Sequence, residues 1–302
     1  MKVVGIGGGH GLAETLRAAL LYADEVAAVV AVADDGGSSG RIVRELGVPP
    51  PGDVRNCLVA LAGDRRAAEL YQHRFRHGEL TGHTVGNLII AALTELYGDF
   101  DLAAEATGEM LGARGRVFPA TTQLVTLGAR VAGGTLSGQV AVGGSTAPIE
   151  AVYLEPPDPV ASHGAVEAIA AADQVVLGPG SLFTSLIATV IVPGITDALR
   201  ATRARRIFVC NTRTQPGETG GLDAAAHVAA LVRHVGGPCL DTALVQAPIL
   251  GNDGVAYERD LWPWPEIELL EADVAAPEGS HSPQRLAHAL SGLGPRPSAA
   301  LG

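Results

Sequence analysis

The stretch from Val29 to Gly40 reads V-V-A-V-A-D-D-G-G-S-S-G and decides the fold. Its first half is part of an apolar run of small and β-branched residues (26–33), and two carboxylates, Asp34 and Asp35, follow this run. An apolar run bounded by turn signals is typical of a buried strand in a parallel sheet. Residues just past such a strand lie at the carboxyl edge of the sheet, where open α/β folds bind their ligands. The stretch therefore predicts a ligand site directly after a buried strand.

The composition of the whole chain limits the class of protein. A chain of 302 residues is long enough for one large domain or two joined lobes. Hydrophobic residues make up 47% but aromatic residues only 4%, so the core must consist of Ala, Val, Leu and Ile. The net charge of −11 argues against nucleic acid or an anionic membrane as the main partner.

The cysteines and the apolar segments indicate a cytoplasmic protein. The three cysteines, Cys57, Cys210 and Cys239, have no metal-like spacing and are expected to be buried thiols in a reducing compartment. The N-terminus lacks the features of a signal peptide. No stretch has about 18 uninterrupted apolar residues, so no membrane span is expected.

A glycine loop, residues 7–11, follows an expected first strand (2–6) and precedes an expected helix (12–22). Strand, glycine loop and helix together are typical of a nucleotide-binding opening, in which helix amides meet a phosphate. The loop matches neither G-x-G-x-x-G nor a Walker loop, so by itself it fits a tight turn equally well. The strand that ends at Asp34 favours a phosphate site, because the Rossmann pattern holds a ribose with an acid at that place.

Two further loops are expected at the same edge of the sheet. Gly178-Pro179-Gly180-Ser181 follows a strand at 173–177, and the loop 211–219 follows a strand at 205–210. The backbone amides and hydroxyl groups of the loop 178–181 suit a diphosphate. The alternative is that this loop is a rigid turn with Ser181 as a helix cap.

Other polar residues have a structural interpretation beside the functional one. Asp53 is predicted to cap a helix that runs to residue 62, and this role is favoured over ligand binding. Asn87 fits a helix cap and His83 a hydrogen-bonded loop histidine. Consecutive helices are expected between 64 and 112 as an insertion, and alternating Gly, Thr and Val between 114 and 142 predict a small antiparallel patch.

The C-terminal part carries less signal. The segment 251–302 is predicted to be an extension of a domain that spans 1–250. It contains a stiff apolar segment, Trp262 to Pro265, and an expected helix at 283–293. The last residues, 294–302, are rich in Pro, Ala and Gly and are expected to be disordered.

Six motifs together resemble one family: GGGHG, ADDGGSSGR, PPGDVRNCLVALA, GHTVGNLIIAALTE, LGPGSLFTSL and VCNTRTQPGET. In order and spacing they are similar to the gluconeogenesis factor family, whose CofD-like members are related to 2-phospho-L-lactate transferases. The resemblance covers about residues 1–247. It implies a Rossmann-like three-layer α/β/α fold with a mainly parallel sheet.

The resemblance also implies a function. It suggests binding of a UDP-sugar such as UDP-N-acetylglucosamine and a cytoplasmic role in cell shape and cell-wall precursor supply during gluconeogenic growth. The contacts that it implies for the nucleotide or diphosphate are Gly8, Gly9, His10, Gly11, Asp34, Ser38, Gly180, Ser181, Asn211, Thr214 and Gln215. Asp34 and Asp53 are candidate ligands of Mg²⁺.

Two classes of function stay open. The protein is expected to be a UDP-sugar sensor that signals to a regulatory protein partner; the alternative is a Mg²⁺-dependent transferase with a nucleotide-diphosphate donor. An NAD(P)-dependent oxidoreductase is disfavoured because the dinucleotide glycine pattern is absent, and Lys2 is the single lysine of the chain. Apolar helices and the segment at 262–265 are compatible with a homodimer.

Overall fold

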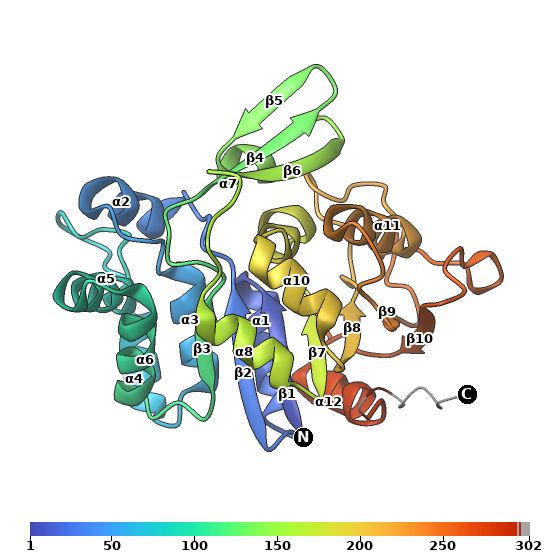
Figure 1. The fold of residues 1–302 in the computed structure, drawn as a ribbon, viewed down its shortest axis with the longest axis horizontal. Coiled ribbons are helices and arrows are strands. Elements are labelled where there is room, and N and C mark those ends of the chain that lie inside the picture. Colours follow the sequence, from blue (N-terminus) through green and yellow to red (C-terminus); the bar gives the residue numbers. More distant parts are fainter. Residues whose placement is uncertain (295, 297–302) are drawn as a thin grey trace.

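The protein is built around a seven-stranded, all-parallel sheet with the strand order β10-β9-β8-β7-β1-β2-β3 (Figure 1). The computed structural model describes residues 1–294 and 296. The Rossmann-like α/β fold that the sequence predicts is confirmed. The strands are β1 (Lys2–Gly7), β2 (Glu25–Val30), β3 (Arg116–Pro119), β7 (Gln174–Leu177), β8 (Arg205–Val209), β9 (Thr242–Gln246) and β10 (Glu268–Ala272).

The strand order places a topological switch point at the centre of the sheet. β1 pairs with β2 on one side, where Val3 lies opposite Val26, and with β7 on the other, where Val3 lies opposite Gln174. The chain thus leaves β1 in one direction and later returns to its other side. Ligands of open α/β sheets bind outside the carboxyl ends of the strands at such a point.

Two apolar cores cover the two faces of the sheet. One core packs Val3, Ala28 and Val30 against helices α1 (Gly9–Ala19), α3 (Gly52–Leu61) and α12 (Pro283–Ser291). The other packs Val4, Ile6 and Val29 under α8 (His163–Ala171), α9 (Ala188–Val190), α10 (Pro193–Ala201) and α11 (Ala224–Val235). Successive strand residues alternate between the cores, because side chains of a strand point to opposite faces.

The helical insertion expected at 64–112 is present at the β3 end of the sheet (Figure 1). It consists of α4 (Arg65–Gln72), α5 (Val85–Tyr97) and α6 (Phe100–Met110), and α2 (Gly37–Leu46) lies against α5. Thr84 caps α5 through its hydroxyl, and Asp99 caps α6 through its carboxylate. The predicted cap role of Asn87 is therefore wrong, because Thr84 occupies the cap position.

The antiparallel patch expected at 114–142 is divided between two sheets. Its first strand, β3, extends the large sheet. In the small sheet β4 (Thr126–Val131) is central and pairs with β5 (Gly134–Ser137) on one side and β6 (Ile149–Glu155) on the other. This small sheet and the short helix α7 (Gln139–Gly143) stand above the large sheet in Figure 1. Alternating apolar and polar residues indicate a strand but not the strand with which it pairs. For this reason the sequence analysis assigned β3 to the small antiparallel sheet.

The chain beyond residue 250 continues the same sheet. β10 pairs with β9, and α12, close to the expected helix at 283–293, contacts α1. A 3₁₀ turn, η2 (Arg259–Leu261), precedes Trp262, whose ring N–H donates to Ile267 O. The disorder expected for 294–302 falls almost entirely outside the described residues.

Within the described part of the chain, no single helix combines the length and apolarity needed to cross a bilayer. The segments Leu182–Val190 and Pro193–Ala201 are long and apolar enough only when they are counted together, and the two are bent by 76° relative to each other.

Candidate functional site

The loop after β1 presents an open helix N-terminus at the switch point. Gly7 has a φ of +148°, Gly8 is the cap residue and offers no side chain, and α1 begins at Gly9, whose amide donates to the carboxylate of Asp53. The first amides of a helix have no partner within the helix and form the positive end of its dipole. His10, in this first turn, is exposed. The arrangement is a candidate anion site, since helix N-termini of this kind bind phosphate.

Two of these glycines are required by close contacts. A Cβ on Gly8 would lie 2.4 Å from Asp53 Oδ2, and one on Gly11 would lie 2.4 Å from the backbone oxygen of Pro179. Gly11 therefore lets α1 approach the loop after β7, and Gly8 lets it approach α3. Side chains at these positions would push apart the elements that meet at the switch point.

Asp34 and Asp53 lie together on the β2 side of this loop. Asp53 stands in the first turn of α3, whose cap position is occupied by Pro51, and no side chain caps that helix. The predicted cap role of Asp53 is thus wrong; the carboxylate faces Gly8 instead. Burial and the neighbouring charge of Asp34 raise the pKa of Asp53 to about 6, although a hydrogen bond from the Gly9 amide opposes the shift.

The two acids after β2 point in different directions. Asp34 accepts a hydrogen bond from Gly36 N at 2.9 Å and lies near Gly52 of α3. Asp35 is exposed and accepts a hydrogen bond from Val140 N at 2.9 Å, in the first turn of α7. Asp34 therefore belongs to the candidate site, and Asp35 ties the small sheet to the large one.

The second glycine loop differs from the first because its helix N-terminus is already satisfied. The π-helical segment η1 (Leu182–Ile187) follows Ser181. Glu218 Oε2 accepts from Phe183 N at 3.0 Å and from Thr184 N at 3.3 Å, and its Oε1 accepts from Thr184 Oγ1 at 2.6 Å. A carboxylate of the protein thus holds the groups that the sequence offered to a diphosphate.

Asn211 fixes the same loop from the neighbouring strand. Its Nδ2 donates to Gly180 O at 2.9 Å, and its Oδ1 accepts from Gly180 N at 3.0 Å. The remaining contacts are longer: Asn211 Nδ2 to Gln215 Oε1 at 3.3 Å, and Gln215 Nε2 to Ser181 Oγ at 3.5 Å. This two-point contact makes Asn211 a positioning residue of the site.

A cavity of about 530 Å³ lies between α1 and the loops after β7 and β8. Of the residues predicted for the site, it brings together His10, Gly11, Gly180, Asn211, Thr214 and Gln215. Gly8, Gly9, Asp34, Asp53, Ser38 and Ser181 are not part of its lining. Gly8 nevertheless connects the two groups, because it precedes α1 and contacts Asp53.

Several lining residues were not found from the sequence. They are Glu14, Thr212, Arg213, Glu278, Gly279, Ser280 and His281. Arg213 forms an ion pair with Asp253, and His281 Nε2 lies 3.2 Å from Cys210 O. Burial lowers the pKa of His281 to about 4, so this ring is neutral at pH 7. The segment 278–281 carries no motif, and only tertiary structure brings it to the site.

Ser38 belongs to a buried polar network behind the site. Its Oγ lies 3.0 Å from His83 Nδ1 and accepts from Asn87 Nδ2 at 3.1 Å. Arg55 Nε donates to Asn87 Oδ1 at 2.8 Å, and Arg55 Nη1 donates to Gln72 at 2.7 Å. The network connects α2, α3, α4 and α5, so Ser38 contributes to the scaffold that holds Asp34 and Asp53.

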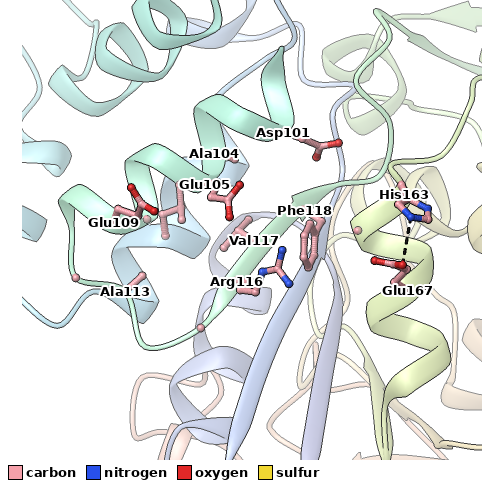
Figure 2. Close-up of a pocket in the computed structure, with 15 residues that line it drawn as sticks. Asp101, Ala104, Glu105, Glu109, Ala113, Arg116, Val117, Phe118, His163 and Glu167 are labelled. Carbon is pink, nitrogen blue, oxygen red and sulfur yellow. Dashed lines mark ion pairs between the residues drawn. The ribbon is translucent and has the colours of Figure 1, made fainter. Parts of the chain in front are cut away.

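A second concavity, of about 470 Å³, lies between α6 and α8 at the β3 end of the sheet. Figure 2 shows Glu105 and Glu109 on one wall, His163 and Glu167 on the other, and Phe118 between them. The guanidinium of Arg116 lies 4.7 Å from the centre of the Phe118 ring. None of the predicted site residues lines this concavity, and the carboxyl edge remains the candidate site.

The two carboxylates fit a magnesium ion that is shared with a ligand. Among the described residues, no group of three or more His, Cys, Asp or Glu side chains could hold a metal by itself. Mg²⁺ is usually held by one or two carboxylates together with substrate phosphates and water. Asp34 and Asp53 next to an anion site meet this requirement, and a cation there would relieve their mutual repulsion.

Comparisons with known proteins agree with the fold. The family model of the 2-phospho-L-lactate transferase CofD matches residues 3–265, so the fold is that of a CofD-type domain. A Mycobacterium leprae relative is 43% identical over 97% of this chain and 86% of its own length. The gluconeogenesis factor of Halalkalibacterium halodurans is 42% identical over 86% of this chain and 82% of its own length.

A solved structure supports the same relationship. The crystal structure of a UPF0052 family member from Bacillus halodurans superposes with a TM-score of 0.92 at 34% identity and covers 96% of this chain and 98% of that one. This chain belongs to the gluconeogenesis factor family.

Proposed function

We propose that the protein binds a nucleotide-diphosphate sugar of the UDP-N-acetylglucosamine type at the N-terminus of α1 and acts as a regulatory protein. In this proposal the bound ligand is a signal. The protein reports it in the cytoplasm to a partner protein that controls cell-wall precursor supply, and hence cell shape, under gluconeogenic growth. The diphosphate lies on the amides at 10–11, and the rest of the ligand extends into the cavity beside the loop 211–215.

The observation that carries the proposal is the difference between the two glycine loops. At the start of α1 the carboxylate of Asp53 meets the Gly9 amide, and no described side chain accepts from the amides of His10 and Gly11, whereas the amides at the start of η1 are held by Glu218. The sole basic side chain of the cavity lining apart from His10 and His281 is Arg213, which is paired with Asp253. A diphosphate there depends on helix amides, and it lies near two carboxylates that a cation would neutralise.

The CofD match favours a second candidate, a Mg²⁺-dependent transferase with a nucleotide-diphosphate donor. Asp34 and Asp53 would hold the ion, which would supply charge stabilisation at the phosphates when bound. The chain's own residues would orient the donor through the α1 amides. An acceptor would have to reach the same edge of the sheet in line with the donor phosphate.

Calorimetric titration with UDP-N-acetylglucosamine, UDP-glucose, GDP and NAD, each with and without Mg²⁺, tests the proposal. We expect micromolar binding confined to UDP-sugars, strengthened by Mg²⁺ and lost in Asn211→Ala. A preference for GDP with Mg²⁺ would favour the transferase. Steady release of UMP or UDP from a UDP-sugar by the pure protein would contradict a purely regulatory role.

The control variant should remove a similar amide from a place outside the site. Gln284 is exposed in the first turn of α12, where its side chain accepts a hydrogen bond from Ser282 Oγ at 3.3 Å. Gln284→Ala is expected to bind UDP-sugars like the unmodified protein. Equal losses in Asn211→Ala and Gln284→Ala would show that the first variant does not report on the site.

A further inference from the structure

Two arginine side chains from different elements lie on one loop near the N-terminus of α5. Arg41, in α2, donates from Nη2 to Thr81 O at 2.8 Å, and Arg74 donates from Nη1 to Gly82 O at 2.6 Å. The two carbonyl groups belong to neighbouring residues of the loop at 73–84. A Cβ on Gly82 would lie 3.0 Å from Arg41 Nη2, so this glycine lets the guanidinium lie against the loop. Two positive charges are thus held close together.

Arg55 brings a third positive charge from the interior. It lies in α3 and is 5% exposed. Its Nε donates to Asn87 Oδ1 at 2.8 Å and its Nη1 to Gln72 Oε1 at 2.7 Å, and both acceptors are uncharged amide oxygens. Burial lowers the pKa of Arg55 to about 10, and the charge of Arg74 acts in the same direction. The effect of Arg74 shows that the buried guanidinium belongs to the same cluster.

His83 completes the cluster as an uncharged group. It is buried, and its Nδ1 lies 3.0 Å from Ser38 Oγ. Burial and the charge of Arg41 lower the pKa of His83, although Glu45 opposes the shift, so the ring is neutral at pH 7. The cluster therefore combines three permanent positive charges with a neutral ring that can form hydrogen bonds.

A second buried arginine, Arg206, shows what such a charge normally requires. It is 4% exposed and donates to Asp241 from Nε at 3.1 Å and from Nη2 at 2.9 Å. In the described part of the chain, none of the three clustered arginines forms an ion pair, although Asp53 lies near enough to act on the pKa of Arg55. Hydrogen bonds to neutral oxygens do not cancel a charge, and a buried charge without a counter-charge is costly. The described side chains thus leave the cluster with an excess of positive charge.

We propose that Arg41, Arg55 and Arg74 bind a phosphate monoester in an anion site separate from the N-terminus of α1. A guanidinium carries several N–H donors in a planar fork that matches phosphate oxygens, and the contacts above use one or two of them on each side chain. Helix α5 begins beside the cluster without an acidic residue in its first turn, so its dipole adds positive potential. Arg74 is exposed and Arg41 half-buried, so the ligand reaches the buried Arg55 from the surface. The site goes beyond the proposed function, because it uses none of the α1 amides.

Calorimetric titration with glycerol 3-phosphate tests the proposal, with glycerol and acetate at equal ionic strength as uncharged and carboxylate controls. The titration is made on the unmodified protein and on Gly8→Ala, in which a Cβ 2.4 Å from Asp53 Oδ2 closes the α1 site. Glycerol 3-phosphate is expected to bind both proteins, and glycerol neither. No binding to Gly8→Ala at about 10 mM ligand, or equal binding of acetate, would overturn the proposal.

Removal of one charge locates the site. Arg74→Gln should weaken the binding of glycerol 3-phosphate about tenfold, because a charge-assisted contact is lost. The matched control is Arg203→Gln, since Arg203 is exposed and directly precedes β8, at the opposite edge of the sheet. Equal losses in the two variants would assign the binding to the overall charge of the protein and overturn the proposal.

Thermal unfolding compares the two buried arginines. Arg206→Met leaves Asp241 without its partner and should lower the Tm strongly. Arg55→Met removes a charge without a counter-charge and should lower the Tm less, and glycerol 3-phosphate should no longer raise the Tm of this variant. If Arg55→Met does not fold, Arg41→Gln takes its place, with the same loss of the ligand-induced shift expected. An undiminished shift in the variant used would contradict the assignment of these arginines.

Binding of the two ligands separates this site from the proposed function. Arg74 lies outside the candidate site, so Arg74→Gln should keep the UDP-sugar affinity of the unmodified protein. Loss of glycerol 3-phosphate binding with UDP-sugar binding retained supports the arginine site. Absence of UDP-sugar binding in the unmodified protein, with glycerol 3-phosphate binding intact, would contradict the proposed function alone and support the arginine site.

Discussion

The loops after β1 and β7 are built alike but end in different states. Both contain glycines with positive φ, both connect a buried strand to a helix, and they meet where Gly11 approaches Pro179. At the helix after β1, Asp53 meets the Gly9 amide and no described side chain accepts from the amides of His10 and Gly11. At the helix after β7, Glu218 accepts hydrogen bonds from two amides and a hydroxyl. A glycine loop before a helix therefore identifies a possible anion site, and the distant residues decide whether the site is open.

The largest effect is expected from closing the open loop. Gly8→Ala would place a Cβ 2.4 Å from Asp53 Oδ2 and 3.2 Å from Ser185 Cβ. We expect UDP-sugar affinity to fall about 100-fold, close to 3 kcal/mol, as measured by calorimetric titration. Gly37→Ala is the control, because Gly37 has a φ of +48° but no atom within 4 Å of its Cβ position. It should cost about 1 kcal/mol of stability and leave the affinity unchanged.

Opening the closed loop is the converse experiment. Glu218→Ala leaves Phe183 N and Thr184 N without their carboxylate, and hydrogen bonds to charged groups contribute about 1.5–3 kcal/mol. We expect the free energy of unfolding in urea to fall by about 2 kcal/mol. Inorganic phosphate should then stabilise the variant more than the unmodified protein, since the freed amides can donate hydrogen bonds to a bound anion. Unchanged stability would show that the contact with Glu218 is unimportant.

The acid beside the open loop should make stability depend on pH. Because the pKa of Asp53 is raised to about 6 in the folded protein, the folded state binds a proton more tightly than the unfolded state. The cost of its charge is present above pH 6 and disappears as the pH falls towards 4. Asp53→Asn should therefore raise the free energy of unfolding by up to about 3 kcal/mol at pH 7.5 and change little at pH 4. An equal effect at both pH values would contradict this assignment.

The smallest effect is expected behind the site. Ser38→Ala removes the hydroxyl between His83 and Asn87 and should cost about 1 kcal/mol of stability. If Ser38 is part of the scaffold, UDP-sugar affinity should change less than about twofold, well under 1 kcal/mol. A tenfold loss of affinity would instead make Ser38 a ligand contact, as the family resemblance implied. Urea unfolding and calorimetric titration of the same preparation distinguish the two outcomes.

Local signals predicted most of the architecture and brought several of the predicted site residues to one edge of the sheet. The apolar runs at 26–33, 173–177 and 205–210 correspond to strands of the large sheet, and the acid at Asp34 lies at its carboxyl edge. These features depend on neighbouring residues in the chain, so a sequence shows them. The sequence analysis did not predict the helix at 193–201. The apolar residues before it show no change in spacing that marks where η1 ends and this helix begins.

The rest of the site depends on contacts that no local pattern encodes. Asp53 has the spacing of a helix cap, but Pro51 takes that position and the carboxylate turns to Gly8. The role of Glu218 requires that the loop after β8 fold over the start of η1, and His281 reaches the cavity from the C-terminal segment. In each case tertiary packing decides the role of a residue whose type alone fits several.

The central position of β1 has a consequence for how the protein is made. Residues 2–7 leave the ribosome early, but their second partner strand, β7, begins only at Gln174. The close approach of Gly11 to Pro179 likewise forms only after residue 179 has been synthesised. The pocket at the switch point therefore does not exist on a nascent chain until its second half has emerged and folded back onto the first. Contacts of such long sequence separation slow folding. A ribosome-bound chain that stops before β7 should be unable to hold the ligand.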